Sequence, residues 1–206
     1  MGAQGPPPEV MRLLEQLERI ELERGAIVGL AAHLLGYLIT LVLLLAVEDG
    51  YDPTWMVSET GQLLYNAMFV SIEQPVAGGS PEFDPSRNVL TDATLAEAFT
   101  LPPELYHAVP ILALVLGGVV IARWIGVTSP VSGAVAGLSL GVGGLFFAIT
   151  GTLLFSNDLG SPAFFQSVLL VGLVYPGVCG AVGGGVCGVV AGQFGEQNTG
   201  GTDHHR

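Results

Sequence analysis

The sequence contains no lysine and few charged residues of any kind. Charged residues make up 12% of the 206 positions, and six arginines stand against 18 acidic residues, which leaves a net charge of −12. Soluble globular domains carry about a quarter charged residues, and nucleic-acid binding depends on basic clusters. The composition therefore excludes an ordinary soluble domain and a nucleic-acid partner. Acid excess without lysine is instead typical of a chain from a high-salt cytoplasm, where salt screens the repulsion between carboxylates.

Cysteine and metal-binding patterns are equally scarce. Cys179 and Cys187 are the only cysteines, and eight residues along a helix separate them by roughly 12 Å, too far for a disulfide. The segment 48–104 holds ten acids and one arginine without the spacing of a calcium-binding loop. A weak metal-like cluster, Asp203-His204-His205, lies at the end of the chain. We predict no metal site and no cofactor.

Long apolar runs are what the sequence has in abundance. The only charge in any of these runs is Arg123, at the end of the second of them, and the four cover about 25–47, 105–125, 131–155 and 163–191. A helix needs about 20 residues to cross about 30 Å of hydrocarbon. We therefore expect an all-α polytopic membrane protein, with four transmembrane helices in a domain that covers 25–193.

The parts outside these runs define the expected topology. Arg12, Arg19 and Arg24 precede the first run and Arg123 closes the second, so the positive-inside rule places both termini in the cytoplasm. The expected layout is a cytoplasmic segment 1–24 with an amphipathic helix, a long acidic outer loop 48–104 and a disordered cytoplasmic tail 194–206. The first apolar run begins late and follows an acidic segment, unlike a signal peptide, and the expected location is the cell membrane.

The outer loop has one apolar stretch of its own, at 54–76. Only thirteen residues separate Glu59 from Glu73, which is enough for about 20 Å of helix. A fifth crossing would also place Arg123 outside, against the positive-inside rule. We predict an interfacial or re-entrant helix here, and a fifth span is the alternative.

The segment before the first span has a helical pattern. Val10, Leu13, Leu17 and Ile20 repeat at the 3-4-3 spacing of two heptads. This seam could form a short coiled coil or dock a partner. Two heptads are short for a stable coiled coil, so we expect a juxtamembrane helix that packs on its own bundle.

Glycines at steps of four mark two of the spans. The fourth span carries Gly180, Gly184, Gly188 and Gly192, and the third carries Gly133, Gly137 and Gly141. In lipid, small residues at this spacing let helix backbones approach closely, so we predict that these ridges pack helices, either within a protomer or between protomers.

Residues 183–188 also match the dinucleotide pattern G-x-G-x-x-G, but no strand precedes them and no acid follows at the required distance. Pro176 removes a backbone hydrogen bond and should kink the fourth helix.

Polar residues inside the spans are few. His33 and Ser139, the centre of a G-x-S-x-G pattern, each lie eight residues from the inner end of a span and so reach similar depths. A mid-helix serine lacks the turn of a nucleophile elbow, and the spans hold no acid to orient the histidine. We predict no catalytic residues and no enzyme, and we expect His33 to hydrogen-bond Ser139, Tyr37 or Thr40. Ionisable groups within a bilayer are candidates for function, so His33, with Ser139 and Tyr37, is the polar candidate here.

Four blocks of the chain carry a family resemblance. They are RGAIVGLAAHLLGYLIT at 24–40, LLYNAMFV at 63–70, VPILALVLGGVVIAR at 109–123 and VLLVGLVYPGVCGAVGG at 168–184. Together they resemble a haloarchaeal multi-pass membrane protein family without an established function, whose members are sometimes loosely labelled transporters. The resemblance carries over no functional residues. It implies that LLYNAMFV is a family feature, which makes Tyr65 and Asn66 candidates in an outer-face element.

Two functions fit these features. The first is a structural or accessory membrane protein that works in the lipid bilayer through glycine-mediated helix packing, as a homo-oligomer or with other membrane subunits. The alternative is a small-solute permease or channel, which four helices would form only as an oligomer because they enclose little volume.

Overall fold

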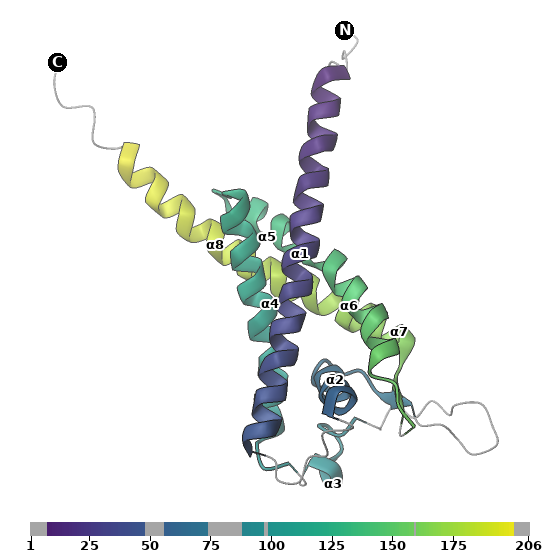
Figure 1. The fold of residues 1–206 in the computed structure, drawn as a ribbon. Coiled ribbons are helices and arrows are strands. Elements are labelled where there is room, and N and C mark those ends of the chain that lie inside the picture. Colours follow the sequence, from purple (N-terminus) through teal and green to yellow (C-terminus); the bar gives the residue numbers. More distant parts are fainter. Residues whose placement is uncertain (1–7, 48–55, 74–87, 97–98, 159, 200–206) are drawn as a thin grey trace, which may run out of the picture.

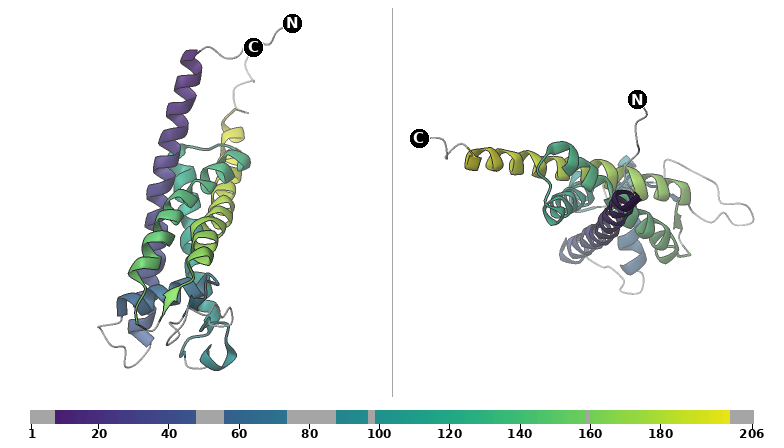
Figure 2. Two further views of the ribbon diagram at one scale, coloured as in Figure 1. Left: turned by 90° about the vertical axis from the view of Figure 1, so that its right-hand side faces the viewer. Right: turned by 90° about the horizontal axis from the view of Figure 1, so that it is seen from above.

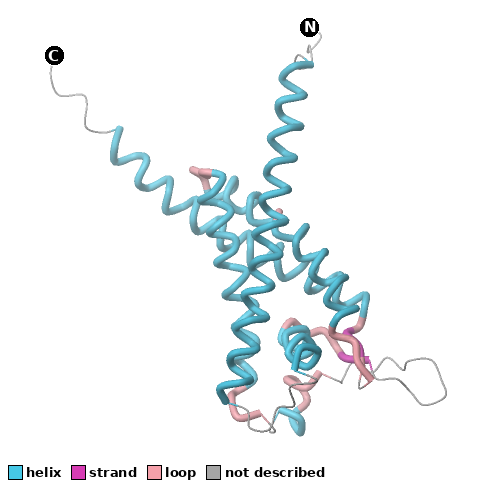
Figure 3. The backbone as a smooth tube through the Cα atoms, viewed as in Figure 1, coloured by secondary structure: helices cyan, strands magenta, loops and turns pink. Residues whose placement is uncertain are grey.

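The chain is almost entirely helical, as the apolar runs predict. The computed structural model describes residues 8–47, 56–73, 88–96, 99–158 and 160–199 (Figures 1 and 3). Its elements in chain order are α1 (Pro8–Val47), α2 (Met56–Ala67), β1 (Ile72–Glu73), α3 (Ala93–Ala96), α4 (Pro103–Ile125), α5 (Pro130–Leu138), α6 (Leu140–Leu154), β2 (Ser161–Pro162), α7 (Phe164–Gln166), the π-helix η1 (Ser167–Val174) and α8 (Tyr175–Thr199). The expected all-α fold class is confirmed, and the sheet in the described residues is a ribbon of two short strands.

Four helices are long and apolar enough to cross a membrane, the number that the sequence predicts. They are Leu22–Val47, Pro103–Ile125, Pro130–Leu154 and Phe164–Gln193. The third consists of α5 and α6, and the fourth consists of α7, η1 and most of α8. Large apolar side chains stay exposed along every one of them, for example Leu38, Leu112, Leu153 and Val178. Apolar surface this extensive fits helices that face lipid.

The four spans pack as a bundle with two different ends (Figures 1 and 2). α1 packs against α4 and α6, and α8 packs against α4 and α5. The helices α2 and α3 and the ribbon gather at one end, whereas the start of α1 and the end of α8 lie at the other (Figure 1). An even number of spans therefore places the start of α1 and the end of α8 at the same end of the bundle.

The apolar stretch at 54–76 does not form a fifth span. Its helix α2 has 12 residues, about 18 Å of rise, and it lies across the end of the bundle at a steep angle to α1 (Figure 1). The chain then turns at Met68 and Phe69 and enters β1, which pairs antiparallel with β2. The fifth-span alternative is wrong for the described residues 56–73, because a helix of 12 residues is too short to cross the hydrocarbon.

Helix α1 continues well beyond the bundle. It has 40 residues, about 60 Å of rise, of which the span accounts for Leu22–Val47. The ribbon of residues 8–21, which we name the N-terminal arm, extends past the other described helices (Figures 1 and 2). The prediction that this helix packs on its own bundle is therefore wrong. No glycine or proline lies between Pro8 and Gly25, so nothing interrupts the helix and lets it fold back.

The fourth span also continues past its predicted end. Helix α8 runs to Thr199, so residues 194–199 are helical and the predicted disordered tail starts too early. Glutamate and glutamine at 196 and 197 favour helix, and no proline precedes Gly200-Gly201. The remainder of the predicted tail, 200–206, lies outside the described residues, together with its Asp-His-His cluster.

Candidate functional site

The two glycine ridges face each other within one chain. Helices α5 and α8 run antiparallel, with Gly133 beside Gly184 and Gly137 beside Gly180. A Cβ added to any of these four residues would collide with the backbone carbonyl group of its partner. Backbones this close leave no room for a side chain, which is the geometry that small residues permit in lipid. These glycines therefore join helices inside the protomer, and they are not available to join one protomer to another.

Of the other ridge glycines, Gly188 is packed as closely as these four, whereas Gly192 and Gly141 have more space. Gly188 contacts the carbonyl group of Ser129, Gly192 lies near that of Thr128, and Gly141 lies near that of Gly172. A second close contact, between α1 and α6, places Gly29 against Leu140 and Gly143 against Ala26. Gly143 lies outside the four-residue spacing of the ridge, so that spacing gives no sign of this contact.

His33 lies in the interior, where α1, α6 and η1 meet. Its side chain is 2% exposed and stacks on the ring of Phe147, with centroids 4.9 Å apart and ring planes at 26°. Nδ1 lies 2.8 Å from the carbonyl oxygen of Gly29 in α1, and Nε2 lies 3.2 Å from that of Val171 in η1. The side chain thus links the first span to the fourth, and both ring nitrogens face backbone acceptors.

The carbonyl group of Val171 is available to His33 because of Pro176. In a π-helix each N–H bonds to the carbonyl five residues earlier, and in η1 the N–H of Tyr175 donates to Leu170 in this way. The next bond would join residue 176 to Val171, but proline has no N–H. Pro176, predicted as a helix kink, therefore lies where η1 gives way to α8, and the histidine occupies the acceptor that the proline leaves open.

Ser139 does not hydrogen-bond His33. It separates α5 from α6, where the regular helix is interrupted, and its hydroxyl donates to the carbonyl of Ala136 at 2.6 Å. On α1 it packs against Gly25, about two turns before His33. The expected bond between the two is wrong, because the serine is satisfied within its own helix.

The two other partners expected for His33 also bond elsewhere. Tyr37 donates to the carbonyl of Val57 at 3.2 Å and so links α1 to α2. Thr40 donates to the carbonyl of Gly36, one turn earlier in α1, at 2.9 Å. The sequence offered no signal for the acceptor that His33 does use, since a backbone carbonyl is present at every residue.

Tyr65 inserts from α2 into the interior of the bundle. It is fully buried, and its hydroxyl shares its hydrogen between the carbonyl oxygens of Phe147 and Ala148, at 3.1 and 3.0 Å. The hydroxyl lies in space that a Cβ at Gly151 would fill. Burial raises the pKa of Tyr65, since a phenolate away from water is costly. The sequence marked Tyr65 as a candidate in an outer-face element, and the structure places its side chain in the core.

The ring of Tyr65 joins an aromatic cluster that reaches His33. It lies against Phe147 and Phe155, at centroid distances of 6.1 and 5.6 Å. Phe155 in turn stacks on Tyr37 at 5.6 Å with nearly parallel planes. The cluster therefore connects the cap helix α2 with α1 and α6, and we name it the aromatic cluster.

Asn66 links α2 to the described end of the outer loop. Its Oδ1 accepts from the N–H of Val89 at 2.8 Å, and its Nδ2 donates to the carbonyl of Gln62 at 2.8 Å. Its own carbonyl accepts from Nδ2 of Asn88, also at 2.8 Å. With 1% of its surface exposed, Asn66 is a buried anchor for residues 88–90.

We expect Asn66→Ala to loosen the loop without unfolding the bundle. The change leaves the N–H of Val89 without its acceptor, which costs about 1–3 kcal/mol for a buried polar group. Hydrogen exchange of residues 88–96 should become faster, while exchange in α8 stays at the wild-type rate. Leu95→Ala serves as the control, because that side chain is 44% exposed. Unchanged protection of 88–96 in Asn66→Ala would show that Asn66 is not the anchor.

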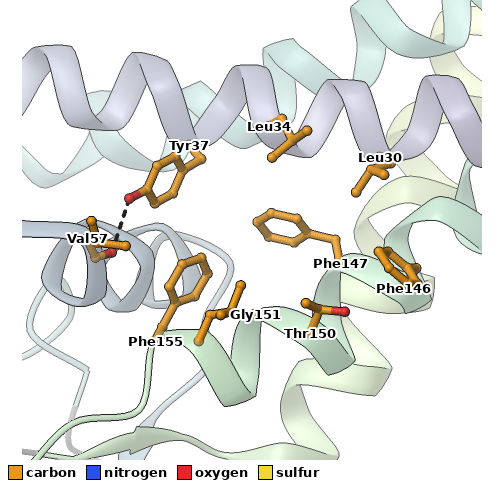
Figure 4. Close-up of a pocket in the computed structure, with 10 residues that line it drawn as sticks. Leu30, Leu34, Tyr37, Val57, Phe146, Phe147, Thr150, Gly151 and Phe155 are labelled. Carbon is orange, nitrogen blue, oxygen red and sulfur yellow. Dashed lines mark hydrogen bonds between the residues drawn. The ribbon is translucent and has the colours of Figure 1, made fainter.

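A groove lies beside the aromatic cluster, between α1, α2 and α6 (Figure 4). Its volume is about 370 Å³, and the rings of Tyr37, Phe147 and Phe155 face into it. The rest of the lining is apolar apart from Thr150, and it includes the exposed side chains of Leu34 and Leu154. The groove therefore suits hydrocarbon and provides no polar path into the protein.

The chemistry that this interior supports is packing and hydrogen bonding. Among the described residues, no three His, Cys, Asp or Glu side chains come together in a way that could hold a metal ion. Cys179 and Cys187, both described, are free thiols. Ser139 and His33, the one nucleophile and base that the sequence singled out together, are bonded to separate carbonyl groups.

These features define a multi-pass membrane protein, a bundle of four spans closed at one end by a short buried helix. Across residues 13–191 the chain matches DUF7978, a family of unknown function, and it belongs to that family. The match includes the first three spans, nearly all of the fourth, the cap helix and most of the N-terminal arm. Comparison with curated proteins and with solved structures gave no match.

Proposed function

We propose that the protein is a structural or accessory component of a membrane assembly, and that the N-terminal arm docks another membrane subunit. The observation that carries this proposal is the unbroken helix α1, which extends from Pro8 to Val47 and holds residues 8–21 beyond the bundle. A helix fixed in direction by a packed span loses little further freedom on binding, which lowers the cost of docking. The heptad seam at 10–20 would offer the partner an apolar face.

The closed bundle supports the same role. Helices α5 and α8 pack backbone to backbone, and the polar atoms of His33, Thr40 and Tyr65 bond to main-chain carbonyl groups. The grooves beside α1 are lined almost wholly by apolar side chains. Neither groove offers polar groups to a solute, which favours a scaffold over a pore.

Isolation of the assembly from a native host tests the proposal. The acid excess and the absence of lysine support a salt-adapted, archaeal source, so crosslinking and affinity isolation are done at molar salt. We expect a defined set of other membrane subunits with the wild-type chain. Leu17→Asp places a charge on the seam and should lower their recovery about tenfold, equivalent to about 1.4 kcal/mol.

Met11→Asp is the matched control, because it makes a similar apolar-to-acid change off the seam and should leave recovery unchanged. Recovery of the other subunits at the same level with both variants would show that the arm does not dock them. Recovery of this chain alone would replace the accessory role with a homo-oligomer.

A permease or channel formed by an oligomer is the second candidate. The observation that favours it is that two adjoining spans are both irregular, the third at Ser139 and the fourth through η1, with Gly144 packed against Pro176 between them. Transporters often build their sites from interrupted helices. Solute release from vesicles that contain a purified homo-oligomer would support this function, and release no faster than from empty vesicles would end it.

A further inference from the structure

The ring of His33 faces two acceptors and no donor. The carbonyl oxygens of Gly29 and Val171 lie 2.8 and 3.2 Å from its two nitrogens. A neutral imidazole has one N–H donor and one lone pair, whereas an imidazolium has two N–H donors. Only the imidazolium can donate to both carbonyl groups, since the neutral ring would direct its lone pair at a carbonyl oxygen.

The two acceptors are not equivalent. The carbonyl of Gly29 lies four residues before His33 in the α-helix α1, so it also accepts the backbone N–H of residue 33. The carbonyl of Val171 has no backbone donor in the π register, because residue 176 is proline. The bond from Nε2 therefore satisfies a carbonyl group that no backbone N–H reaches in the π register.

One face of the ring also favours its charged form. The face of Phe147 lies 4.9 Å away and nearly parallel, an arrangement in which an aromatic ring attracts a cation. Glu23, Arg24, Glu59 and the thiols of α8 lie outside the core cluster around Phe147 and Val171. The titratable side chains that pack in this cluster are Tyr37 of α1, Tyr65 of α2 and Tyr175 of α8. None of these side chains is ordinarily ionised at neutral pH, and α6 and η1 add no titratable side chain near the ring. Burial opposes a charge at this depth, and the two carbonyl groups and the ring face act against that cost.

We propose that His33 is a proton-binding site inside the membrane, and that its protonated form holds η1 to α1. Proton binding places an N–H on each nitrogen, and the bonds to Gly29 and Val171 form together. Proton loss leaves one N–H, so either the link to Val171 breaks or the ring turns away from Gly29. The occupancy of one proton is thereby coupled to the position of the π-helix in the fourth span.

Solid-state NMR of the full-length wild-type chain in lipid vesicles tests this directly. Histidine is labelled with ¹⁵N and the valine carbonyl with ¹³C, because His33 is the described histidine that bonds to a valine carbonyl, whereas His107 bonds to that of Ala67. Spectra are recorded from about pH 5 to about pH 8, the range in which histidine usually titrates. We expect both ring nitrogens of His33 to be protonated at the acidic end, and the Val171 carbonyl signal to shift when one proton leaves.

Two results would overturn the proposal. One is a ring with a single protonated nitrogen, or with two, at every pH in this range. The other is a titration that leaves the Val171 signal in place.

Pro176→Ala adds a second test, because it restores an N–H at residue 176 that can bond to Val171. In that variant the Val171 signal should no longer follow the protonation of His33, and a dependence equal to that of the wild type would contradict the role assigned to the open carbonyl.

Discussion

Gly184→Ala should lower the free energy of unfolding by about 1–3 kcal/mol, the usual cost of adding a methyl group to a packed interior. The added Cβ would collide with the carbonyl group of Gly133 on α5. A backbone cannot move aside as the end of a flexible side chain can, so α5 and α8 must separate. Unfolding of the purified protein in detergent micelles, followed by circular dichroism, measures the change.

Gly185→Ala is the matched control for this prediction. It makes the same change one residue later in α8, where an added Cβ would lie at ordinary distances, 3.6 Å from the carbonyl oxygen of Pro130 and 3.9 Å from Cβ of Ala134. Alanine also favours helix over glycine by up to about 1 kcal/mol. We therefore expect stability equal to or above that of the wild type. Equal losses of stability in both variants would mean that the contact with α5 is not the cause. The substitutions would then act through the unfolded chain or through the detergent around the helix.

Tyr65→Ala should destabilise the bundle by about 3–5 kcal/mol, the range for removing a large aromatic side chain from a core. The ring contacts Phe147 and Phe155, and its hydroxyl bonds to two carbonyl groups of α6. Its removal would leave a cavity between the cap helix and the spans. The same unfolding measurement applies, and a loss below about 1 kcal/mol would show that α2 is not part of the cooperative core.

Two further variants separate the parts of this effect. Tyr65→Phe removes the hydroxyl alone and should cost about 0.5–1.5 kcal/mol, the usual net value of one hydrogen bond. Phe165→Ala removes an aromatic ring that is 86% exposed and should leave stability unchanged. A large loss in Phe165→Ala would show that ring deletions destabilise the protein wherever they are made.

Alkaline pH gives a second measurement of the same residue. Burial raises the pKa of Tyr65 in the folded protein, while the unfolded chain keeps the ordinary value of about 10. The unfolded state then releases its proton first, so the stability contributed by Tyr65 is present below about pH 10 and is lost as the pH rises further. The stability of Tyr65→Phe should fall less steeply above about pH 10 than that of the wild type, and parallel curves would contradict the burial of the phenol.

Several features of the site could be anticipated because they depend on residues close together in the chain. The four-residue glycine spacing marks one face of a helix whatever lies opposite, and Pro176 disrupts a helix wherever it occurs. Contacts were less predictable. Ser139 and His33 lie at similar depths by residue count, yet Ser139 packs against Gly25 and bonds within its own helix. Depth alone does not say which faces of two helices meet.

The cap helix shows the same limit. LLYNAMFV is apolar enough to lie in the interface or to dip into lipid, and the sequence does not distinguish these from burial in protein. In the structure Leu64, Tyr65 and Met68 are almost fully buried, because α6 presents Gly151 where the tyrosine hydroxyl needs space. That fit depends on the shape of a surface about 80 residues further along the chain.

The amino-acid sequence alone was enough to predict the four spans, because hydrocarbon imposes one length and one polarity on any helix that crosses it. The glycine ridges followed for a similar reason, since close packing in lipid selects small residues at a fixed spacing. Folding in three dimensions decided that the ridges face each other within one chain and that the N-terminal arm stands free of the bundle. It also placed the carbonyl acceptor of His33 138 residues away along the chain. The sequence did not indicate this contact, because a valine whose carbonyl lacks a backbone donor looks like any other valine.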